Sequence, residues 1–301
     1  MTTARASWAQ QRRFVTDRLR EVGIDSADAE ARWLTETASG YAGAEWLAVA
    51  AKLPNDRAQA HLDAMVERRL AGEPLQYVLG SWSFRGLDLM VDHRVLIPRP
   101  ETEWVVEVAL EEATRVGLRR GVHRALDAET TAVVADLGTG SGAIALVLAA
   151  ELTDAEVWAT DVSSDALAVA AANIAGCGAT RVRLAEGSWF DALPGPLAGT
   201  LALVVANPPY VAAHELDGLA PEVAQHEPHR ALVSGPTGLE AIEELLASAP
   251  AWLAPGAAIV LEIAPHQADV VTAIARTAGF DDVRVLDDFS FRPRVLVARR
   301  G

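Results

Sequence analysis

The sequence predicts an α/β protein in which a doubly wound, Rossmann-like sheet follows a small all-helical region. Residues 1–75 carry their apolar side chains at helical spacing only. After residue 130, short apolar runs alternate with helical patterns, which is typical of a parallel sheet covered by helices. The last two apolar runs have no helix between them, so we expect them to pair antiparallel at one edge of a mixed, seven-stranded sheet.

The pattern divides the chain into three parts. Residues 1–75 are expected to form about four helices that serve as a substrate-docking domain. Residues 76–100 change to short alternating runs around two glycines, which predicts a β-hairpin linker. The prolines of "IPRPETE" force an extended stretch ahead of a helix that begins near Thr102. Residues 101–301 form the third part, which carries the chemistry.

The predicted strands of the third part are short apolar runs. In chain order they read AVVADLG, EVWATDV, RVRLAEG, LALVVAN, AAIVLEIA, VRVLDD and PRVLVARR. The clearest helical patterns are SSDALAVAAANIAG, TGLEAIEELLASAPAWL and HQADVVTAIARTAG. Because parallel strands end at the same edge of a sheet, ligand-binding residues are expected just after several of these runs.

Composition limits the classes of partner. The chain of 301 residues has a formal charge of −15, from 26 basic and 41 acidic side chains, and nearly all of the excess lies after residue 76. An acidic body repels phosphate backbones, which argues against direct nucleic-acid binding. The single cysteine, Cys177, excludes an internal disulfide. No apolar run reaches the ~18 residues of a membrane span, and the first twenty residues show no signal-peptide pattern, so we expect a cytoplasmic protein without membrane contact.

The stretch VVADLGTGSGAIAL places Gly138, Gly140 and Gly142 between a buried strand and a helix. Glycines there allow a sharp turn and a close approach of a ligand. The next strand ends in Asp161, whose carboxylate can accept hydrogen bonds from ribose hydroxyls. Because Asp136 stands just before the loop, a pyrophosphate would meet a carboxylate, whereas S-adenosylmethionine presents cationic groups. The charge favours S-adenosylmethionine and leaves a dinucleotide as the alternative.

Two further strand ends carry polar or aromatic residues. In TDVSSDAL, either Ser163 or Ser164 can cap the following helix. In EGSWFDAL, Trp189 can lie against an adenine face or serve as an ordinary core aromatic, and its position alone does not decide between the two.

The stretch VVANPPYV drives a buried strand into Asn207, Pro208, Pro209 and Tyr210, none of which suits a strand. Its end should lie beside the glycine loop, at the crevice where such sheets bind ligands. A planar amino or amide nitrogen is a poor nucleophile because its lone pair is delocalised. The Asn207 oxygen and the Pro208 carbonyl can accept its two N–H bonds, while Tyr210 stacks on the flat group and faces the sulfonium methyl. The motif predicts direct methyl transfer to such a nitrogen.

Taken together, these segments resemble the HemK/PrmC family of protein-(glutamine-N5) methyltransferases, which modify the glutamine of the Gly-Gly-Gln motif in class-1 peptide chain release factors. The resemblance covers most of the chain: PLQYVLGSWSFRGLDLMVDHRVLIPRPETE, DLGTGSGAIAL, TDVSSDAL, SWF, NPPYV, HEPHRALVSGPTGLEAI and LEIAPHQADVV. Asn-Pro-Pro-Tyr alone is shared with amino-methylating DNA and RNA enzymes. The chain departs from the family pattern at Ala264 and over SGPTGL, Ser234 to Leu239.

The resemblance implies a class I S-adenosylmethionine-dependent methyltransferase fold, S-adenosylmethionine as the cofactor, a release factor as the protein partner and no metal; we also expect a monomer. By position it implies a catalytic set of Asn207, Pro208 and Tyr210, with Pro209 and Phe84 added for substrate binding. It implies cofactor contacts from Gly138, Thr139, Gly140, Ser141, Gly142, Asp161, Trp189 and Asn207. It gives the linker residues Arg99, Glu101 and Glu103 no role beyond ion pairing or the pocket rim.

Other functions remain as alternatives. A nucleic-acid amino-methyltransferase of the adenine-N6 type would need a basic recognition region, and the acidic body offers no sign of one. A dinucleotide-dependent oxidoreductase has no use for Asn207, and an inactive adaptor does not need the complete set of cofactor positions. The acidic and histidine residues around HEPHRAL could pass for metal ligands, but the pattern favours a surface or helix-end cluster. They are Glu222, His226, Glu227 and His229.

Overall fold

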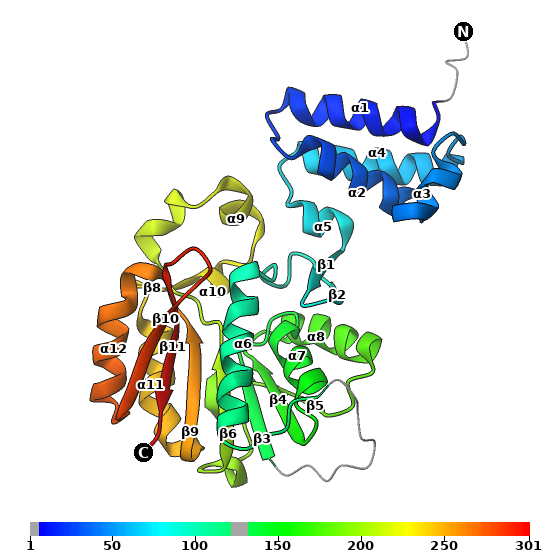
Figure 1. Ribbon diagram of the computed structural model, residues 1–301. Helices are drawn as coiled ribbons and strands as arrows, with labels where there is room; N and C mark the ends of the chain where they lie inside the picture. Colours follow the sequence, from blue (N-terminus) through cyan, green and yellow to red (C-terminus); the bar gives the residue numbers. More distant parts are fainter. Residues whose placement is uncertain (1–5, 122–131) are drawn as a thin grey trace. The chain divides into compact units, whose positions relative to one another are not determined.

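The computed structural model describes residues 6–121 and 132–301 (Figure 1). The chain forms two compact units. The first comprises the residues up to Ser81 together with Pro221–His226, and the second comprises Trp82–Ala220 and Glu227–Gly301. A short segment from late in the chain therefore belongs to the same unit as the N-terminal helices, which the sequence pattern did not indicate.

The first unit is built from helices. They are α1 (Trp8–Glu21), α2 (Ala27–Ser39), α3 (Gly43–Val49), α4 (Asp56–Leu70), α5 (Leu75–Leu79) and α9 (Pro221–His226). The four helices predicted before residue 75 are confirmed. Helix α5 lies where the sequence analysis expected the linker to begin. It is helical because Leu75 and Val78 pack into the core of this unit and Gly80 ends the helix in a left-handed conformation.

A buried arginine joins three helices of the first unit. Arg69, at the end of α4, is only 6% exposed. Its Nε donates to Glu30 Oε2 of α2 at 2.6 Å, and its Nη1 donates to Glu222 Oε1 of α9 at 2.7 Å. Glu30 is buried as well, so the charges of Arg69 and Glu30 compensate each other away from water.

The remaining elements follow in chain order. The strands are β1 (Ser81–Phe84), β2 (Leu87–Met90), β3 (Ala132–Leu137), β4 (Ala155–Asp161), β5 (Val182–Glu186), β6 (Leu201–Ala206), β7 (Val211–Ala212), β8 (Val233–Gly235), β9 (Leu253–Glu262), β10 (Asp282–Asp287) and β11 (Pro293–Arg299). The α-helices are α6 (Pro100–Arg115), α7 (Ala143–Glu151), α8 (Ser164–Cys177), α10 (His229–Leu232), α11 (Glu240–Trp252) and α12 (Ala268–Thr277). Short 3₁₀ turns are η1 (Trp189–Ala192), η2 (Gly195–Leu197), η3 (Ala213–Gly218) and η4 (Pro265–Gln267).

The second unit contains the predicted seven-stranded mixed sheet, in the order β10-β11-β9-β6-β3-β4-β5. The strands from β9 to β5 in this order pair in parallel, whereas β11 runs antiparallel to both of its neighbours. The expected antiparallel edge pair is therefore confirmed. Strand β6 lies directly beside β3, with Val205 opposite Asp136. The residues that follow these two strands consequently leave the sheet at the same edge.

Helices cover both faces of this sheet (Figure 1). Side chains of α6 and α7, such as Val106 and Leu146, share one core with inward-facing strand residues. Side chains of α11 and α12, such as Leu245 and Val271, share the other. Helix α6 begins at Pro100, two residues before the predicted start, because proline suits the first position of a helix.

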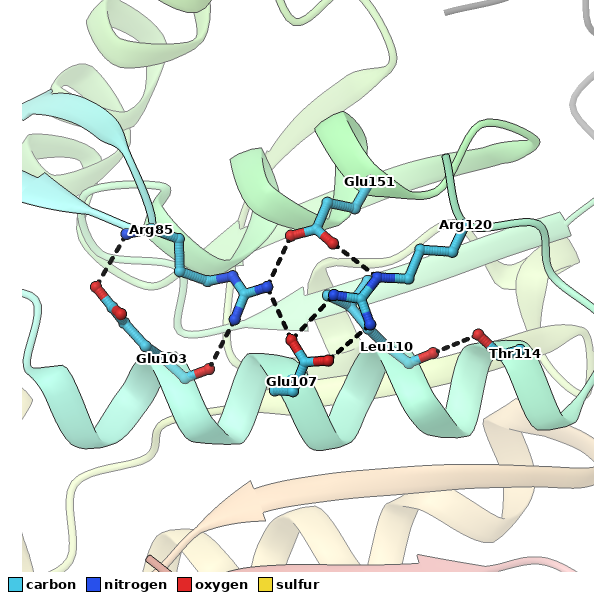
Figure 2. Close-up of polar contacts among 7 residues, drawn as sticks. All are labelled: Arg85, Glu103, Glu107, Leu110, Thr114, Arg120 and Glu151. Atoms are coloured by element: carbon cyan, nitrogen blue, oxygen red, sulfur yellow. Dashed lines mark hydrogen bonds and ion pairs between the residues drawn. The ribbon is translucent and has the colours of Figure 1, made fainter. Parts of the chain in front are cut away.

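The predicted β-hairpin, β1–β2, is present and is tied to α6 and α7 by a charged cluster (Figure 2). The backbone N–H of Arg85, in the hairpin turn, donates to Glu103 Oε1 at 2.9 Å. The Arg85 guanidinium donates to Glu107 and Glu151, each at 2.9 Å. Arg120 binds the same two carboxylates. The hairpin is therefore attached to the second unit by paired charges in addition to its apolar residues.

Within the described residues, no helix combines the length and hydropathy needed to cross a membrane. Cys177 is an exposed free thiol at the end of α8.

Candidate active site

A cavity opens at the edge of the sheet where β3, β4 and β6 end. This is the position at which open α/β sheets bind ligands. Its walls come from the loop after β3, the ends of β4 and β6, the segment that leads into α6, and α10. Lining residues include Thr102, Gly138, Thr139, Ser141, Asp161, Trp189, Asn207 and Pro209.

The loop after β3 turns tightly against the cavity. Gly138 has a φ of +76°, and a Cβ on it would lie 3.1 Å from the Trp189 ring. Its N–H donates to the Thr160 carbonyl of β4 at 2.9 Å, which holds the loop against the neighbouring strand. Only glycine permits both the conformation and the close approach of the ring.

The predicted cofactor residues of the loop divide into two groups. Gly138, Thr139 and Ser141 line the cavity. Gly140 and Gly142 do not: the Gly140 N–H turns to the end of β4, and Gly142 is the N-terminal cap of α7. These two glycines shape the loop instead of forming the surface of the cavity.

Asp161 stands at the end of β4, in the cavity wall. Its two oxygens accept backbone N–H bonds from Gly140 and Ser163, each at 2.9 Å. Burial raises the pKa of Asp161, while these two bonds and the charge of Arg230 oppose the rise. An ionised carboxylate has about four acceptor positions, so capacity for two ligand hydroxyls remains. Ser163 also caps α8 by accepting from Ala166 N, as predicted.

Trp189 begins η1, is half-buried, and both lines the cavity and packs against the apolar core beside α11. Its ring lies over the Gly138 backbone. Apolar side chains continue the wall that it starts: Leu96, Ile144, Val162 and Ala166. A flat apolar wall beside a carboxylate suits a nucleoside, whose base is apolar on its faces and whose sugar carries hydroxyls.

Asp136 does not face the cavity, contrary to the charge argument drawn from its sequence position. It is fully buried, and its Oδ2 accepts from Thr139 Oγ1 at 2.6 Å and from Ala145 N of α7 at 3.0 Å. Its Oδ1 has no partner among the described residues. Burial, which outweighs the two hydrogen bonds, raises the pKa of Asp136 to about 7. The carboxyl group therefore holds the first turn of α7. Because it is buried, its ionised form is disfavoured.

The residues after β6 present an amide to the cavity. Asn207 and Pro209 line it, whereas Pro208 is buried behind them. The Asn207 Nδ2 donates to Thr102 Oγ1 of α6 at 3.2 Å. Within residues 6–121 and 132–301, neither the Asn207 Oδ1 nor the Pro208 carbonyl accepts a hydrogen bond. Both oxygens are thus unengaged in the described part of the chain, and of the two residues only Asn207 lines the cavity.

Tyr210 is not where the motif predicted it. Its ring is absent from the lining of the cavity and packs against the core beside α11 and α12. Its hydroxyl donates to Glu262 Oε1, at the end of β9, at 3.3 Å. Burial raises the pKa of Tyr210, and the neighbouring Glu262 raises it further. The buried carboxylate and the apolar core account for this position, which is adjacent to the cavity wall and not on its surface.

Phe84 is likewise not brought to the cavity. It is 1% exposed and belongs to the core formed with α6 and α7. Only the last side chain of β1 is buried, and Phe84 occupies that position. We therefore correct its assignment from substrate binding to anchoring of the hairpin.

The linker residues that the sequence left without a role form ion pairs or hydrogen bonds. Arg99, the N-terminal cap residue of α6, pairs with the buried Glu227. Burial raises the pKa of Glu227, and Arg99 opposes the rise. Glu103 holds the hairpin turn, and Glu101 lies 3.8 Å from Arg292.

The carboxylates in and just before HEPHRAL form ion pairs with arginines: Glu222 with Arg69, and Glu227 with Arg99. Among the described residues, the structure contains no group of three histidine, cysteine, aspartate or glutamate side chains that could hold a metal ion.

The segment SGPTGL, one of the two departures from the family pattern, supports the backbone after the motif. Gly238 has a φ of +79°, and a Cβ on it would lie 2.7 Å from the Tyr210 carbonyl. Gln267 Nε2 donates to the carbonyls of both residues, at 3.0 Å and 3.1 Å. Ala264, the second departure, is buried beside this contact, and its N–H donates to Gln267 Oε1.

Several residues of the site have no role that was predicted from the sequence. Thr102 and Arg230 line the cavity, and Glu262 lies behind it. Glu262 offered a signal, because an acidic residue ends an otherwise apolar strand. Thr102 offered none, since threonine is ordinary in the first turn of a helix.

Solved structures with a similar fold include methyltransferases. A methyltransferase from Pyrococcus furiosus is 19% identical, covers 81% of this chain and 98% of its own, and has a TM-score of 0.50. The Thermus thermophilus 16S rRNA N2 G1207 methyltransferase, solved with AdoMet and guanosine, is 18% identical over 73% of this chain and 50% of its own, also with a TM-score of 0.50. The fold and the site together define a methyltransferase with the class I fold.

Sequence comparison identifies the family within that class. Models described as the PrmC N-terminal domain and the methyltransferase small domain match residues 10–80 and 120–237. The release factor glutamine methyltransferase of Deinococcus radiodurans is 39% identical over 95% of this chain and 96% of its own. That of Moorella thermoacetica is 43% identical over 78% of each chain. The chain belongs to the family of release factor glutamine methyltransferases.

Proposed function

We propose that this protein transfers the methyl group of S-adenosylmethionine to the side-chain amide nitrogen N5 of the glutamine in the Gly-Gly-Gln motif of class-1 peptide chain release factors. Membership of the family supports the substrate. The observation that carries the chemistry is the Asn207 amide, which lines the same cavity as Asp161 and the glycine loop.

The residues of the cavity fit S-adenosylmethionine. The remaining acceptor capacity of Asp161 suits the ribose hydroxyls, and the wall that begins at Trp189 suits the adenine. Gly138 allows the ligand to approach the backbone without a Cβ in the way. When bound, S-adenosylmethionine supplies an electrophilic methyl group on a sulfonium.

Asn207 and Pro208 hold the amide that receives the methyl group. The Asn207 Oδ1 and the Pro208 carbonyl accept one N–H each from the glutamine side chain. This arrangement favours lone-pair density on N5 in the direction of the methyl group and excludes competing orientations of the amide. Because the two prolines restrict the backbone, little conformational entropy is lost when the substrate binds. Tyr210 contributes by position, as a support for this backbone, and not by stacking on the substrate.

Three statements about the setting belong to the same proposal. The protein acts in the cytoplasm, where release factors meet ribosomes, and it acts as a monomer. It makes no direct contact with nucleic acid, which its net charge of −15 supports. The helical first unit docks the release factor, since it carries no feature of the cavity.

The alternative, methylation of an adenine amino group, is not favoured. The curated relatives at about 39% identity over most of the chain act on release factors by name. The rRNA-modifying enzyme of similar fold is 18% identical, so its likeness extends to the fold alone.

Mass spectrometry of a purified release factor, after incubation with the protein and S-adenosylmethionine, tests the proposal. We expect one added methyl group on the glutamine of the Gly-Gly-Gln motif. Asn207→Ala should lose the transfer and keep its affinity for S-adenosylmethionine. A methyl group on an adenine of an added nucleic acid, with none on the glutamine, would refute the proposed substrate.

A further inference from the structure

A continuous chain of hydrogen bonds runs behind the cavity wall. It begins at Glu262, the last residue of β9, which is 1% exposed. Thr102 Oγ1 of α6 donates to Glu262 Oε2 at 2.7 Å, and Asn207 Nδ2 donates to Thr102 Oγ1 at 3.2 Å. Tyr210 donates to the other oxygen of the same carboxylate. None of the roles assigned above explains why a carboxylate is buried at this point.

The number of protons available to these hydrogen-bonded groups determines which group donates in each bond. An ionised carboxylate can only accept, and a threonine hydroxyl has one proton to donate. The short bond to Glu262 commits that proton, so the Thr102 oxygen can only accept from its other neighbour. The group of Asn207 that meets Thr102 must therefore be the NH₂, and its oxygen must point away from Thr102.

This constraint matters because the amide of asparagine is nearly symmetric in shape. A rotation of 180° about its last torsion costs little by sterics alone, since that torsion is broad and two-fold. The rotated amide would direct an NH₂ at the substrate, where the proposed reaction needs an acceptor. A hydrogen-bond donor facing the N–H groups of the glutamine would repel them.

We propose that Glu262 is a positioning residue that acts through Thr102 to hold the Asn207 amide with its oxygen toward the cavity. The inference rests on the proposed function, because it concerns the acceptor that the function requires. Glu262 does not line the cavity. Its second bond, to Tyr210, stabilises the backbone that follows the motif.

The groups around Glu262 affect its pKa and therefore the pH range in which these hydrogen bonds keep the same donors and acceptors. Burial raises the pKa of Glu262, while its bonds to Thr102 and Tyr210 and the charge of Arg294 on β11 oppose the rise, and Glu101 on α6 adds to it. Protonation would give the carboxyl a donor of its own, so Thr102 would no longer be restricted to accepting from Asn207. Catalysis should therefore weaken at acidic pH, when the carboxyl is neutral.

The experiment compares three threonine variants of the full-length protein. Thr102→Val removes the hydroxyl at nearly constant volume, and Thr102→Ser keeps it. Thr114→Val makes the same change later in α6, where the hydroxyl only bonds the Leu110 carbonyl (Figure 2). Steady-state methylation of a release factor gives kcat and KM, and calorimetry gives the dissociation constant of S-adenosylmethionine.

We expect Thr102→Val to lower kcat about 100-fold, a loss that the displacement of a catalytic group can cause. The dissociation constant of S-adenosylmethionine and the KM should change less than about threefold. Thr102→Ser should recover most of the kcat, and Thr114→Val should match the parent. An unchanged kcat in Thr102→Val would overturn the inference. So would a loss of cofactor affinity as large as the loss of kcat, because that result indicates a structural role.

A fourth variant, Glu262→Gln, tests the ionised state. The kcat of the parent, measured at saturating substrates, should fall toward acidic pH. The kcat of Glu262→Gln should be low at every pH and should show no further decrease toward acidic pH. The same acidic limb in both proteins would contradict the role of Glu262.

Nuclear magnetic resonance of the substrate-free protein separates this inference from the proposed function. The side-chain NH₂ signals of Asn207 should exchange with water slowly in the parent and at least about tenfold faster in Thr102→Val, which lacks the acceptor. Equal exchange in both would overturn the inference even if the protein methylates glutamine. A parent that fails to methylate glutamine but shows the difference would refute only the proposed function.

Discussion

Asp136→Asn should gain stability relative to the parent as the pH rises from acidic to neutral. The parent carboxylate is fully buried, and its Oδ1 has no partner in the part of the chain that the structure describes. Burial raises its pKa from 3.8 to about 7. An asparagine can keep its oxygen on Thr139 and Ala145, where the parent accepts both of its hydrogen bonds, and it carries no charge.

The pH dependence follows from the direction of this shift. Between pH 4 and 7 the folded parent retains a proton on Asp136 that the unfolded chain has released. The free energy of unfolding therefore falls as the pH rises through that window and stops falling above about pH 7. At 1.36 kcal/mol for each pKa unit, the whole window is worth about 4 kcal/mol, and the part between pH 5.5 and 7 about 2 kcal/mol.

Urea unfolding of both proteins without S-adenosylmethionine, followed by near-ultraviolet circular dichroism at several pH values from 5.5 to 8, measures the effect. We expect the stability of Asp136→Asn relative to the parent to increase by about 2 kcal/mol across this range. An unsatisfied asparagine NH₂ would shift all values by a constant and leave the slope unchanged.

Asp154→Asn is the matched control for this titration. Asp154 is also buried, but its carboxylate is paired with Arg119. This variant measures what the exchange of a buried, paired aspartate for asparagine does to the free energy of unfolding. If Asp136→Asn followed the parent in parallel over the whole range, the reasoning about the buried charge would be wrong.

Three further changes have expected outcomes. Asp161→Ala should weaken S-adenosylmethionine binding about 10- to 100-fold, measured by calorimetry, because a ribose hydroxyl loses a charged acceptor; unaltered affinity would exclude the ribose role. Gly238→Ala should lower kcat at least about tenfold, because its Cβ would lie 2.7 Å from the Tyr210 carbonyl. An unchanged kcat would show that the backbone after the motif can shift without loss of activity. Arg69→Met should lower the free energy of unfolding by about 3–5 kcal/mol, because it leaves the Glu30 charge buried without its ion-pair partner. Thermal or urea unfolding measures this loss, and a value below about 1 kcal/mol would show that Glu30 reaches water.

Much of the fold was accessible from local patterns. The seven strand candidates correspond to β3, β4, β5, β6, β9, β10 and β11, because each is a short apolar run between polar segments. The helix starts were also readable, as at Ser163, whose hydroxyl caps α8. Helix α5 was missed, since a five-residue helix is determined by what Leu75 and Val78 pack against and not by periodicity.

The site was accessible only in part. Residues that approach a ligand through the backbone, such as Gly138, follow directly from their type and spacing. The direction of a side chain at the end of a strand does not, because a buried acceptor or an apolar core can turn it aside. Tyr210 and Phe84 show this, since each was expected at the cavity and each packs in a core.

The amino-acid sequence by itself determined the order of the elements, the family and the segments that form the cavity, because these depend on periodicity, turn-forming residues and motifs that are local in the chain. Only the tertiary structure decided which end of the Asn207 side-chain amide, its NH₂ or its oxygen, meets Thr102. That choice depends on Thr102 and Glu262, which lie 105 and 55 positions away in the sequence and meet Asn207 through the packing of α6 and β9 beside β6. A hydrogen bond orients an amide only when its partner is in place, and no residue of the motif itself provides a partner for the Asn207 NH₂.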